Sequence, residues 1–266
     1  MRYCSLHTHS MFSDGKHTLE ENVISAIEKG ICVLGFSDHS FTPCDTSYCM
    51  KTEDYPAYLA EIARLKEKYK GKIELLAGIE LDYDSDPDTS LFDYRIASVH
   101  YIIRDGVVYP IDHSKVQQEQ CVAEAFDGDV EKMAKCYFQQ LTDHVKRCKP
   151  TFVGHFDVIT KFGLMPEDSP SYRQIAADAL KEILQVCPYV EMNTGAISRG
   201  YRQTPYPAAY LLNTIKQYGG KILLSSDSHQ KGNLDFWFDE AVALLRQTGF
   251  GSIYLLHSTG FEEVPI

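Results

Sequence analysis

Short apolar runs alternate with stretches of amphipathic helical character along the whole chain. The runs contain many aliphatic residues and few charges, a pattern typical of buried parallel strands. We expect these strands at residues 3–6, 31–36, 73–79, 94–99, 152–154, 189–192, 221–225 and 253–256. Between most of them, apolar residues recur at helical spacing. We expect the helices at residues 18–30, 55–69, 115–125, 129–147, 171–186, 205–218 and 234–246.

Local capping and turn residues support these boundaries. Thr18 precedes the first helical pattern and Glu21 follows three residues later, which is the spacing of a capping box. Gly30 comes just after the last helical position, where a left-handed residue often ends a helix. The pair Asp105-Gly106 lies between two short apolar stretches and predicts a small hairpin there.

The repeated alternation of strand and helix predicts the fold class. It is typical of an α/β protein with a parallel sheet. At a length of 266 residues, such a sheet is expected to roll into a closed or nearly closed TIM-like barrel. No internal repeat, low-complexity tract or linker interrupts the pattern, so we expect residues 1–266 to form a single domain.

Metal-ligand residue types follow the predicted strands with unusual regularity. Six of the ten histidines in the chain come directly after an apolar run, together with two acidic residues. The residues are His7, His9, His39, Glu80, His100, His155, Asp227 and His229. In a β/α barrel the carboxyl ends of all strands meet at one face, where active sites form. We therefore expect these side chains to converge there, whereas unrelated surface or packing histidines would be scattered.

The number of these residues predicts more than one metal ion. His7 and His9 are one residue apart, so they point to the same side of an extended chain. Neutral imidazole suits Zn, Mn and Fe. A catalytic zinc ion typically uses three protein ligands plus water, so this set implies two or three ions. Glu80 has two oxygens and is the natural bridge between neighbouring ions. Asp14, in a Ser-Asp-Gly turn, is either a further ligand or a turn-former.

Net charge and cysteine content limit which binding partners and which cellular compartment we expect. The formal net charge is −11 and no run rich in Lys and Arg is present, so we expect neither nucleic acid nor an anionic membrane as a partner. A small phosphorylated substrate fits an acidic chain when metal ions supply positive charge. The eight cysteines are scattered without a Cys-x-x-Cys pair, and no apolar stretch reaches the ~18 residues of a membrane span. We expect a reduced, cytoplasmic protein whose first three residues lead directly into a strand, without a signal peptide.

Several short motifs together resemble the PHP (polymerase and histidinol phosphatase) superfamily. The motifs are, in order, His7-Thr8-His9, Ser37-Asp38-His39, Glu80, Ser98-Val99-His100, His155 and Ser226-Asp227-Ser228-His229. Within the superfamily the chain looks most like the PHP-type histidinol-phosphate phosphatases. The segments that carry this closer likeness are Gly35 to Pro43, Gly154 to Phe162, Glu191 to Gly195 and Tyr206-Pro207. The resemblance spans nearly the whole chain.

The resemblance implies a distorted (β/α)7 barrel with a trinuclear site that uses Zn, Mn or Fe. It also implies three ligand sets, two of which share Glu80. The sets are His7, His9, Glu80 and Asp227; Glu80, His100 and His155; and Asp14, His39 and His229. The identity of the ligand contributed by the first loop is undecided, because either Asp14 or His17 could complete the third set.

The activity implied by the resemblance is hydrolysis of L-histidinol phosphate to L-histidinol and phosphate, in histidine biosynthesis. We expect a metal-activated hydroxide to attack in line, with Glu80, Asp227 and His229 as the catalytic set. The alternative is another small phosphate monoester or a nucleotide as the substrate. A polynucleotide phosphoesterase would need a basic groove. A mononuclear deaminase would need fewer ligands, and a non-catalytic scaffold would show gaps in the ligand set.

Cationic side chains are expected to complete a phosphate pocket. Arg199 is the first candidate, because a guanidinium group matches phosphate oxygens in a bidentate way. Lys161 is the second, and either residue could instead be a solvent-facing charge. Asn193 is expected to orient the substrate or to cap a turn. Asp38, beside His39, is expected to fix an imidazole tautomer and not to bind metal.

Overall fold

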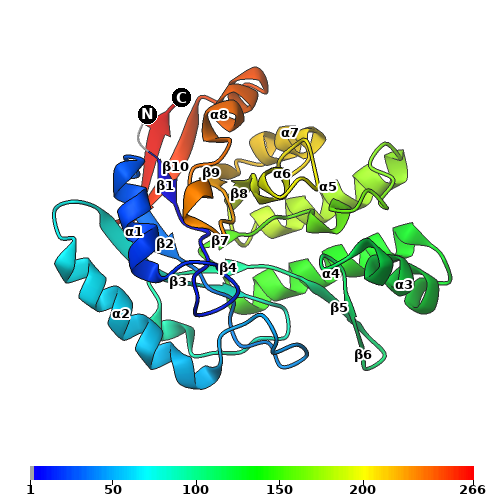
Figure 1. Ribbon diagram of the computed structural model, residues 1–266. Coiled ribbons are helices and arrows are strands. Elements are labelled where there is room, and N and C mark those ends of the chain that lie inside the picture. The colour runs from blue at the N-terminus through cyan, green and yellow to red at the C-terminus, as the bar shows by residue number, and fades with distance from the viewer. Residues whose placement is uncertain (1–2) are drawn as a thin grey trace.

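Seven parallel strands form a nearly closed barrel in the computed structural model, which describes residues 3–266 (Figure 1). Neighbouring strands follow the order β1-β2-β3-β4-β7-β8-β9. Their bounds are β1 (Cys4–Ser5), β2 (Val33–Phe36), β3 (Glu74–Leu81), β4 (Tyr94–Ala97), β7 (Phe152–Val153), β8 (Tyr189–Asn193) and β9 (Lys221–Ser225). The predicted α/β class and distorted (β/α)7 barrel are confirmed. Met1 and Arg2, expected to lead into the first strand, lie outside the described residues.

The barrel closes through residues that follow its first and last strands. Thr8 and Ser228 form a parallel bridge. The backbone N–H of His9 donates to the carbonyl of Ser228 at 2.9 Å, and the N–H of Ser228 donates to the carbonyl of His7 at 3.0 Å. Closure therefore places the His-x-His segment directly beside the segment that carries His229.

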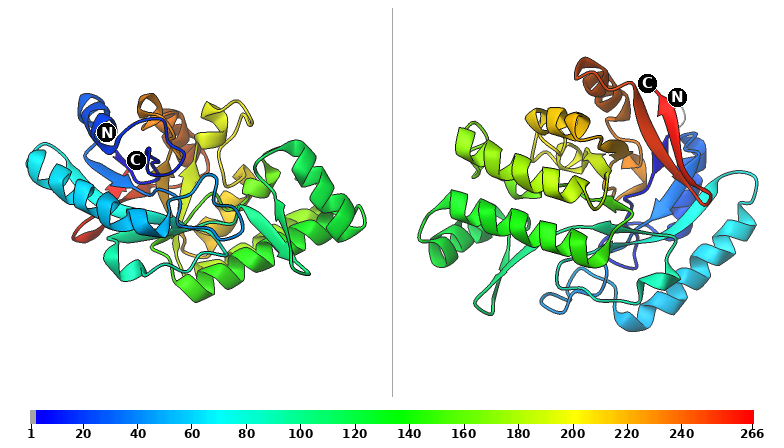
Figure 2. Two further views of the ribbon diagram at one scale, coloured as in Figure 1. Left: turned by 60° about the horizontal axis from the view of Figure 1, so that its bottom comes forward. Right: turned by 180° about the vertical axis from the view of Figure 1, so that it is seen from behind.

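Helices cover the outside of the barrel (Figures 1 and 2). They are α1 (Leu19–Glu28), α2 (Tyr55–Lys68), α3 (Lys115–Phe126), α4 (Val130–Cys148), α5 (Pro170–Leu184), the single-turn α6 (Gly195–Ser198), α7 (Ala209–Gln217) and α8 (Phe238–Gln247). The capping box predicted for α1 is confirmed, because the N–H of Glu21 donates to Oγ1 of Thr18 and the N–H of Thr18 donates to Oε2 of Glu21. Ion pairs of Glu20 with Arg64 and Lys68 join α1 to α2.

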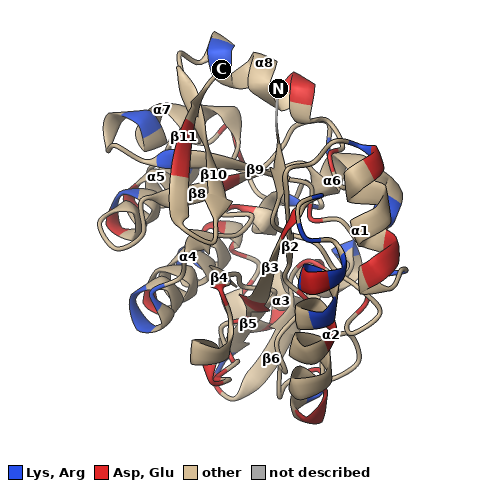
Figure 3. Cartoon of the chain, turned by 90° about the vertical axis from the view of Figure 1, so that its left-hand side faces the viewer, with Lys and Arg blue, Asp and Glu red and all other residues tan. Residues whose placement is uncertain are grey.

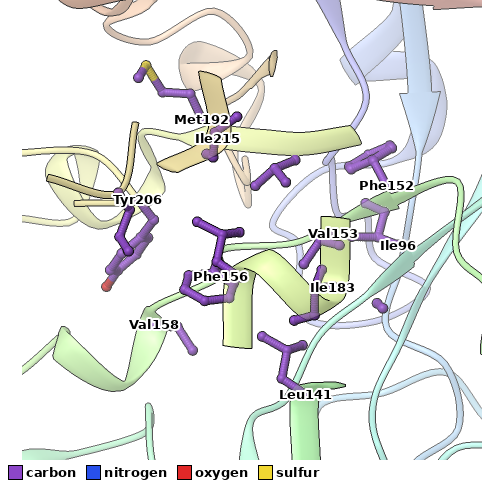
Figure 4. Packing of buried hydrophobic residues seen from close by; sticks show 14 of the residues in the cluster. Ile96, Leu141, Phe152, Val153, Phe156, Val158, Ile183, Met192, Tyr206 and Ile215 are labelled. Atoms are coloured by element: carbon purple, nitrogen blue, oxygen red, sulfur yellow. The ribbon is translucent and has the colours of Figure 1, made fainter. Parts of the chain in front are cut away.

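Aromatic and aliphatic side chains fill the barrel and the layer between strands and helices. Tyr94, on β4, donates from its hydroxyl to the carbonyls of Leu6 and Phe36. Gly35 and Gly78 face its ring, and a Cβ atom at either position would collide with it. These glycines make room for the tyrosine inside the barrel. Figure 4 shows the surrounding core, where the labelled side chains include Ile96 and Val153 of the strands, Leu141 of α4 and Ile183 of α5.

The helix predicted over residues 205–218 is wrong at its start, because α7 begins only at Ala209. Tyr206 instead forms an antiparallel bridge with Asn193, with N–H···O distances of 2.8 and 2.9 Å in the two directions. Pro207 follows Tyr206 and disfavours helical backbone there, and the peptide bond between them is cis. Tyr206 is thereby held against the end of β8.

The C-terminal part also differs from the prediction. Helix α8 starts later than residue 234, because Trp237 adopts a left-handed backbone with φ of 63°. The strand predicted at 253–256 is β10 (Ser252–His257), but it is not the last. It pairs antiparallel with β11 (Gly260–Pro265), outside the seven-stranded sheet.

The hairpin predicted around Asp105-Gly106 is confirmed as β5 (Tyr101–Arg104) and β6 (Val107–Pro110).

Candidate metal centre

The predicted ligand residues converge at one face of the barrel. Glu80 lies near the end of β3, and the others follow β1, β2, β4, β7 and β9. Asp14 joins them from the loop before α1. Of this set, His7, His9 and Glu80 are at most 1% exposed, whereas the side chain of Asp14 is 34% exposed. The group therefore runs from the barrel interior to its rim.

Glu80 lies at the centre of the group. Its Oε2 atom lies 3.1 Å from Nε2 of His7 and 2.9 Å from Nδ1 of His39. Its Oε1 atom lies 3.1 Å from Nε2 of His155 and 3.6 Å from Nε2 of His100. Oε2 also lies 3.6 Å from Nε2 of His9. The two oxygens thus face different imidazoles, which is the arrangement a bridging carboxylate needs.

Asp227 adds a second buried carboxylate, which faces the same ring nitrogens of His7 and His9 as Glu80 does. Its Oδ1 atom lies 3.3 Å from Nε2 of His9 and 3.6 Å from Nδ1 of His229. Its Oδ2 atom accepts a hydrogen bond from Nη2 of Arg199 at 2.9 Å. The backbone of Asp227 is left-handed, with φ of 46°. This conformation follows directly on β9 and turns the side chain toward the imidazoles.

Asp14 belongs to the group, and His17 does not. Oδ2 of Asp14 lies 3.1 Å from Nε2 of His229, and Oδ1 lies 3.7 Å from Nε2 of His39. Nδ1 of His17 instead accepts a hydrogen bond from the backbone N–H of Lys231 at 3.3 Å. The geometry therefore favours Asp14 as the first-loop member.

Asp38 has a different role from the one expected. Its carboxylate accepts hydrogen bonds from the backbone N–H and the hydroxyl of Ser10, at 2.7 and 2.9 Å. It also accepts from the N–H and the hydroxyl of Ser13, at 3.1 and 2.6 Å. Asp38 therefore orders the loop that carries Asp14, because these four hydrogen bonds of its carboxylate all come from this loop and none from an imidazole.

The donor set fits metal ions. Four overlapping groups contain ligand atoms that all lie within 4.8 Å of one another. They are His9, Asp14, His39 and His229; His7, Glu80 and His155; His7, His9 and Asp227; and His39, Glu80 and His100. Within residues 3–266, Nε2 of His7, both ring nitrogens of His9 and Oε2 of Glu80 are buried without a hydrogen-bond partner. Buried polar atoms ordinarily have partners, so these atoms are available to bind cations.

Electrostatics keep two central groups in states that bind metal. Burial alone would raise the pKa of Glu80, but the imidazoles of His7 and His39 hold it well below its ordinary value. Burial, reinforced by neighbouring His229 and His39, lowers the pKa of His9 to about 3. Glu80 is therefore ionised and His9 neutral near pH 7, and both are the forms that coordinate metal.

Two further buried carboxylates orient imidazoles, and sequence reasoning missed both roles. Oε2 of Glu191 lies 3.0 Å from Nδ1 of His7, and Oδ2 of Asp82 lies 2.7 Å from Nδ1 of His100. Such contacts fix the ring tautomer and direct Nε2 at a metal. Asn193, expected to bind substrate or cap a turn, donates to Glu191 at 2.7 Å and accepts from a backbone N–H at 2.8 Å. The second bond caps the turn that follows β8, which is one of the two expected roles, and the first holds the Glu191 carboxylate in place.

A cavity of about 280 Å³ opens over the group. Arg199 and Lys161 both line it, as do Tyr48, Tyr101 and Tyr206. Besides its bond to the Asp227 carboxylate, Arg199 donates from Nη1 to the backbone carbonyl of that residue at 2.9 Å. The cavity thus combines the imidazole and carboxylate group with cationic side chains.

The described surface carries charges of both signs. In the face shown in Figure 3, Lys and Arg are interspersed with Asp and Glu over α1 and α2. Within residues 3–266, no helix is both long and apolar enough to cross a membrane.

Comparison with known proteins identifies the family. The sequence pattern of the PHP domain matches residues 5–195. The chain belongs to the PHP domain family. The matched range includes the predicted ligand positions from His7 to His155, and Asp227 and His229 follow it.

The relatives are histidinol-phosphatases of similar length. A probable histidinol-phosphatase of Deinococcus radiodurans is 28% identical over 96% of both chains. The histidinol-phosphatase of Bacillus subtilis is 25% identical, over 88% of this chain and 96% of that protein. A crystal structure of histidinol phosphate phosphatase from Lactococcus lactis, complexed with Zn, L-histidinol and phosphate, superposes with a TM-score of 0.75. That alignment covers 98% of this chain and 99% of the other, at 22% identity, so it establishes a shared fold.

Proposed function

We propose that this protein hydrolyses L-histidinol phosphate to L-histidinol and inorganic phosphate at a centre of two or three metal ions. The observation that carries the proposal is the position of Glu80, whose two oxygens face five imidazoles at 2.9 to 3.6 Å. A carboxylate in this position is suited to bridge ions in a member of the PHP domain family. The relatives that match nearly the full chain are named for this reaction.

The ligand assignment keeps the three sets that the resemblance to the family implies, and the groups of nearby donor atoms overlap these sets without reproducing them. We assign His7, His9, Glu80 and Asp227 to one ion, Glu80, His100 and His155 to a second, and Asp14, His39 and His229 to a third. Zn, Mn and Fe are the candidate metals, because all three accept imidazole ligands. When bound, such ions lower the pKa of a coordinated water to about 7 and polarise the phosphoryl group.

The chain's own side chains bind and orient the phosphate. Nη1 of Arg199 donates to the Asp227 carbonyl and also lies 3.3 Å from Nδ1 of His229, and one N–H of Nη2 donates to the Asp227 carboxylate. The Nε–H and the second N–H of Nη2 remain as donors for phosphate oxygens. Lys161 also lines the cavity and supplies a second cation. Glu80, Asp227 and His229 are the catalytic set in this proposal, because they hold the reacting centre together beside Arg199.

The cavity and the charge favour a small substrate. A volume of about 280 Å³ lies near the lower end of ligand pockets, roughly 300–1,000 Å³, and suits a small phosphate monoester. A polynucleotide would require a basic groove, whereas this chain has a net charge of −11.

Substrate comparison tests the proposal. Protein reconstituted with Zn or Mn would be assayed for phosphate release from L-histidinol phosphate, p-nitrophenyl phosphate and a nucleoside monophosphate. We expect kcat/KM for L-histidinol phosphate to exceed the others by about 10-fold or more, because a site built for polar groups discriminates against analogues lacking them. Equal values on the three substrates would contradict the assignment, and so would full activity of the metal-free protein.

A further inference from the structure

Asp112 is an acidic side chain in the cavity that the ligand groups do not use. It lines the same cavity as Glu80 and Arg199. It belongs to none of the four groups of donor atoms found within residues 3–266. Its side chain is 25% exposed, so it faces the cavity without being fully immersed in solvent. A role for this carboxylate must therefore be sought outside metal binding.

The backbone around Asp112 is fixed to the metal centre. The N–H of the preceding residue, Ile111, donates to the carbonyl of His100 at 3.0 Å. Nε2 of the buried Gln118 donates to the carbonyl of Ile111 at 2.9 Å and to that of Ile159 at 2.7 Å. One amide group thus joins the segment before Asp112 to the segment before Lys161. A side chain held by such bonds is preorganised to recognise a ligand.

Lys161 leaves part of the acceptor capacity of the Asp112 carboxylate free. Its ammonium donates to the backbone carbonyl of Asp112 at 2.6 Å, whereas Oδ2 of Asp112 lies farther away, at 3.5 Å. The same ammonium lies over the ring of Tyr201, 4.9 Å from its centroid. The shortest hydrogen bond of Lys161 therefore goes to the backbone, and the carboxylate keeps acceptor capacity for a ligand.

The charge of Asp112 needs an explanation in a phosphatase cavity. The substrate brings a phosphate dianion, and a carboxylate outside the metal groups repels it across a partly desolvated space. The repulsion is offset when the carboxylate faces a cation on the other end of the substrate. Burial of Asp112 would raise its pKa, but Lys161 and the imidazoles of His100 and His155 lower it, so the carboxylate is ionised near pH 7.

We propose that Asp112 anchors the cationic end of the leaving alcohol, the ammonium or imidazolium group of histidinol, while Arg199 and Lys161 hold the phosphate. The inference rests on the proposed function and assigns the residue that selects a cationic leaving group. Asp112 is in this account a substrate-binding residue and takes no part in the proton or metal chemistry.

Direct binding tests the anchor without relying on turnover. L-histidinol would be titrated calorimetrically into the metal-loaded protein in the presence of phosphate, for wild type, Asp112→Asn, Asp112→Glu and Asp105→Asn. Asp105 sits at the tip of the neighbouring hairpin with its side chain 91% exposed, which makes it the matched control. We expect Asp112→Asn to raise the Kd of L-histidinol about 10- to 100-fold, as loss of a hydrogen bond to a charged group does. Asp112→Glu should restore part of the affinity, and Asp105→Asn should change nothing.

The affinity for phosphate, compared with the affinity for L-histidinol, decides whether Asp112 contacts the leaving alcohol. In Asp112→Asn, the Kd of inorganic phosphate should not rise, because the variant removes a negative charge that repels the phosphate. Equal losses on L-histidinol and phosphate would overturn the anchor, because they would show that Asp112 only holds Lys161 in place. Titration at pH 6 and pH 8 separates the two cations, because imidazole, with a pKa of about 6.5, is charged only at the lower pH.

The two proposals fail in different ways. If wild type hydrolyses L-histidinol phosphate preferentially but Asp112→Asn binds L-histidinol normally, the anchor is wrong and the proposed function stands. If L-histidinol phosphate is not a preferred substrate but Asp112→Asn still loses affinity for L-histidinol, the function is wrong and the cation site stands.

Discussion

Nδ1 of His7 lies 3.0 Å from Oε2 of Glu191, and both side chains are fully buried. Oε1 of the same carboxylate accepts a hydrogen bond from the backbone N–H of His155 at 2.7 Å. One carboxylate therefore positions two residues of the proposed metal centre, His7 through its ring and His155 through its backbone. Glu191 belongs to none of the four groups of donor atoms, and it affects metal binding only by orienting residues that do.

Glu191→Gln should weaken metal binding more than it weakens folding. Glutamine keeps the size of the side chain but is a poorer acceptor for the His7 ring. We expect metal affinity to fall about 10- to 100-fold, as is typical for residues that orient ligands. Metal titration followed by competition with a chelator would measure this, and Glu182→Gln, at an exposed site, is the control. Unchanged affinity would remove Glu191 from the metal centre.

Arg199→Ala should raise KM and leave the metals in place. The guanidinium holds Oδ2 of Asp227, while Oδ1 faces His9 and His229. Loss of Arg199 therefore removes a phosphate contact without removing a ligand. We expect KM to rise about 10- to 100-fold, with metal content equal to wild type. Arg173→Ala, at an exposed ion pair with Asp168, should behave as wild type. Loss of metal with the kinetic defect would show that Arg199 instead supports the centre.

Stability should depend on pH through His144. Nε2 of its buried ring donates to the carbonyl of Leu81 at 2.9 Å, and Nδ1 accepts from Arg147 at 3.4 Å, so the ring is neutral. Burial lowers the pKa of His144 in the folded state. Between that value and the unfolded value of about 6.5 the unfolded chain binds more protons, so stability falls as pH drops below about 6.5.

Comparison with His144→Gln isolates this effect from the other histidines. Glutamine retains a donor for Leu81 but does not titrate. Chemical denaturation of the metal-free proteins should show wild type losing stability relative to His144→Gln between pH 7.5 and 5. A difference between the two proteins that is the same at every pH would contradict the assignment.

The sequence was sufficient for the barrel because its periodicity is strong. Buried parallel strands read as continuous apolar runs, and the capping box at Thr18 and Glu21 marks a helix start through local bonds alone. The elements it misplaced depend on backbone details with weak local signals. The left-handed residue Trp237 delays α8, and the pairing of Tyr206 with Asn193 replaces the first turn expected for α7.

The candidate site also contains residues whose place could be predicted from the sequence and residues whose place could not. Residues at strand ends could be expected to meet, since barrel topology brings those ends together. The structure does bring Glu80 and Asp227 to the same imidazoles. The partners of Glu191 and Asp82 could not be expected, because an acidic residue in or after an apolar run does not say which ring it faces. Asp112 was missed for a related reason, since its place depends on a hairpin held by Gln118.

The most direct test of the account is the metal content of Glu80→Ala. Wild type and the variant would be loaded with Zn or Mn, freed of excess ion and analysed by inductively coupled plasma mass spectrometry, with the surface variant Glu182→Ala alongside. If Glu80 bridges ions, its removal should cost more than one ion per chain, while Glu182→Ala keeps the full complement. A Glu80→Ala protein that retains the same number of ions as wild type would contradict the shared centre.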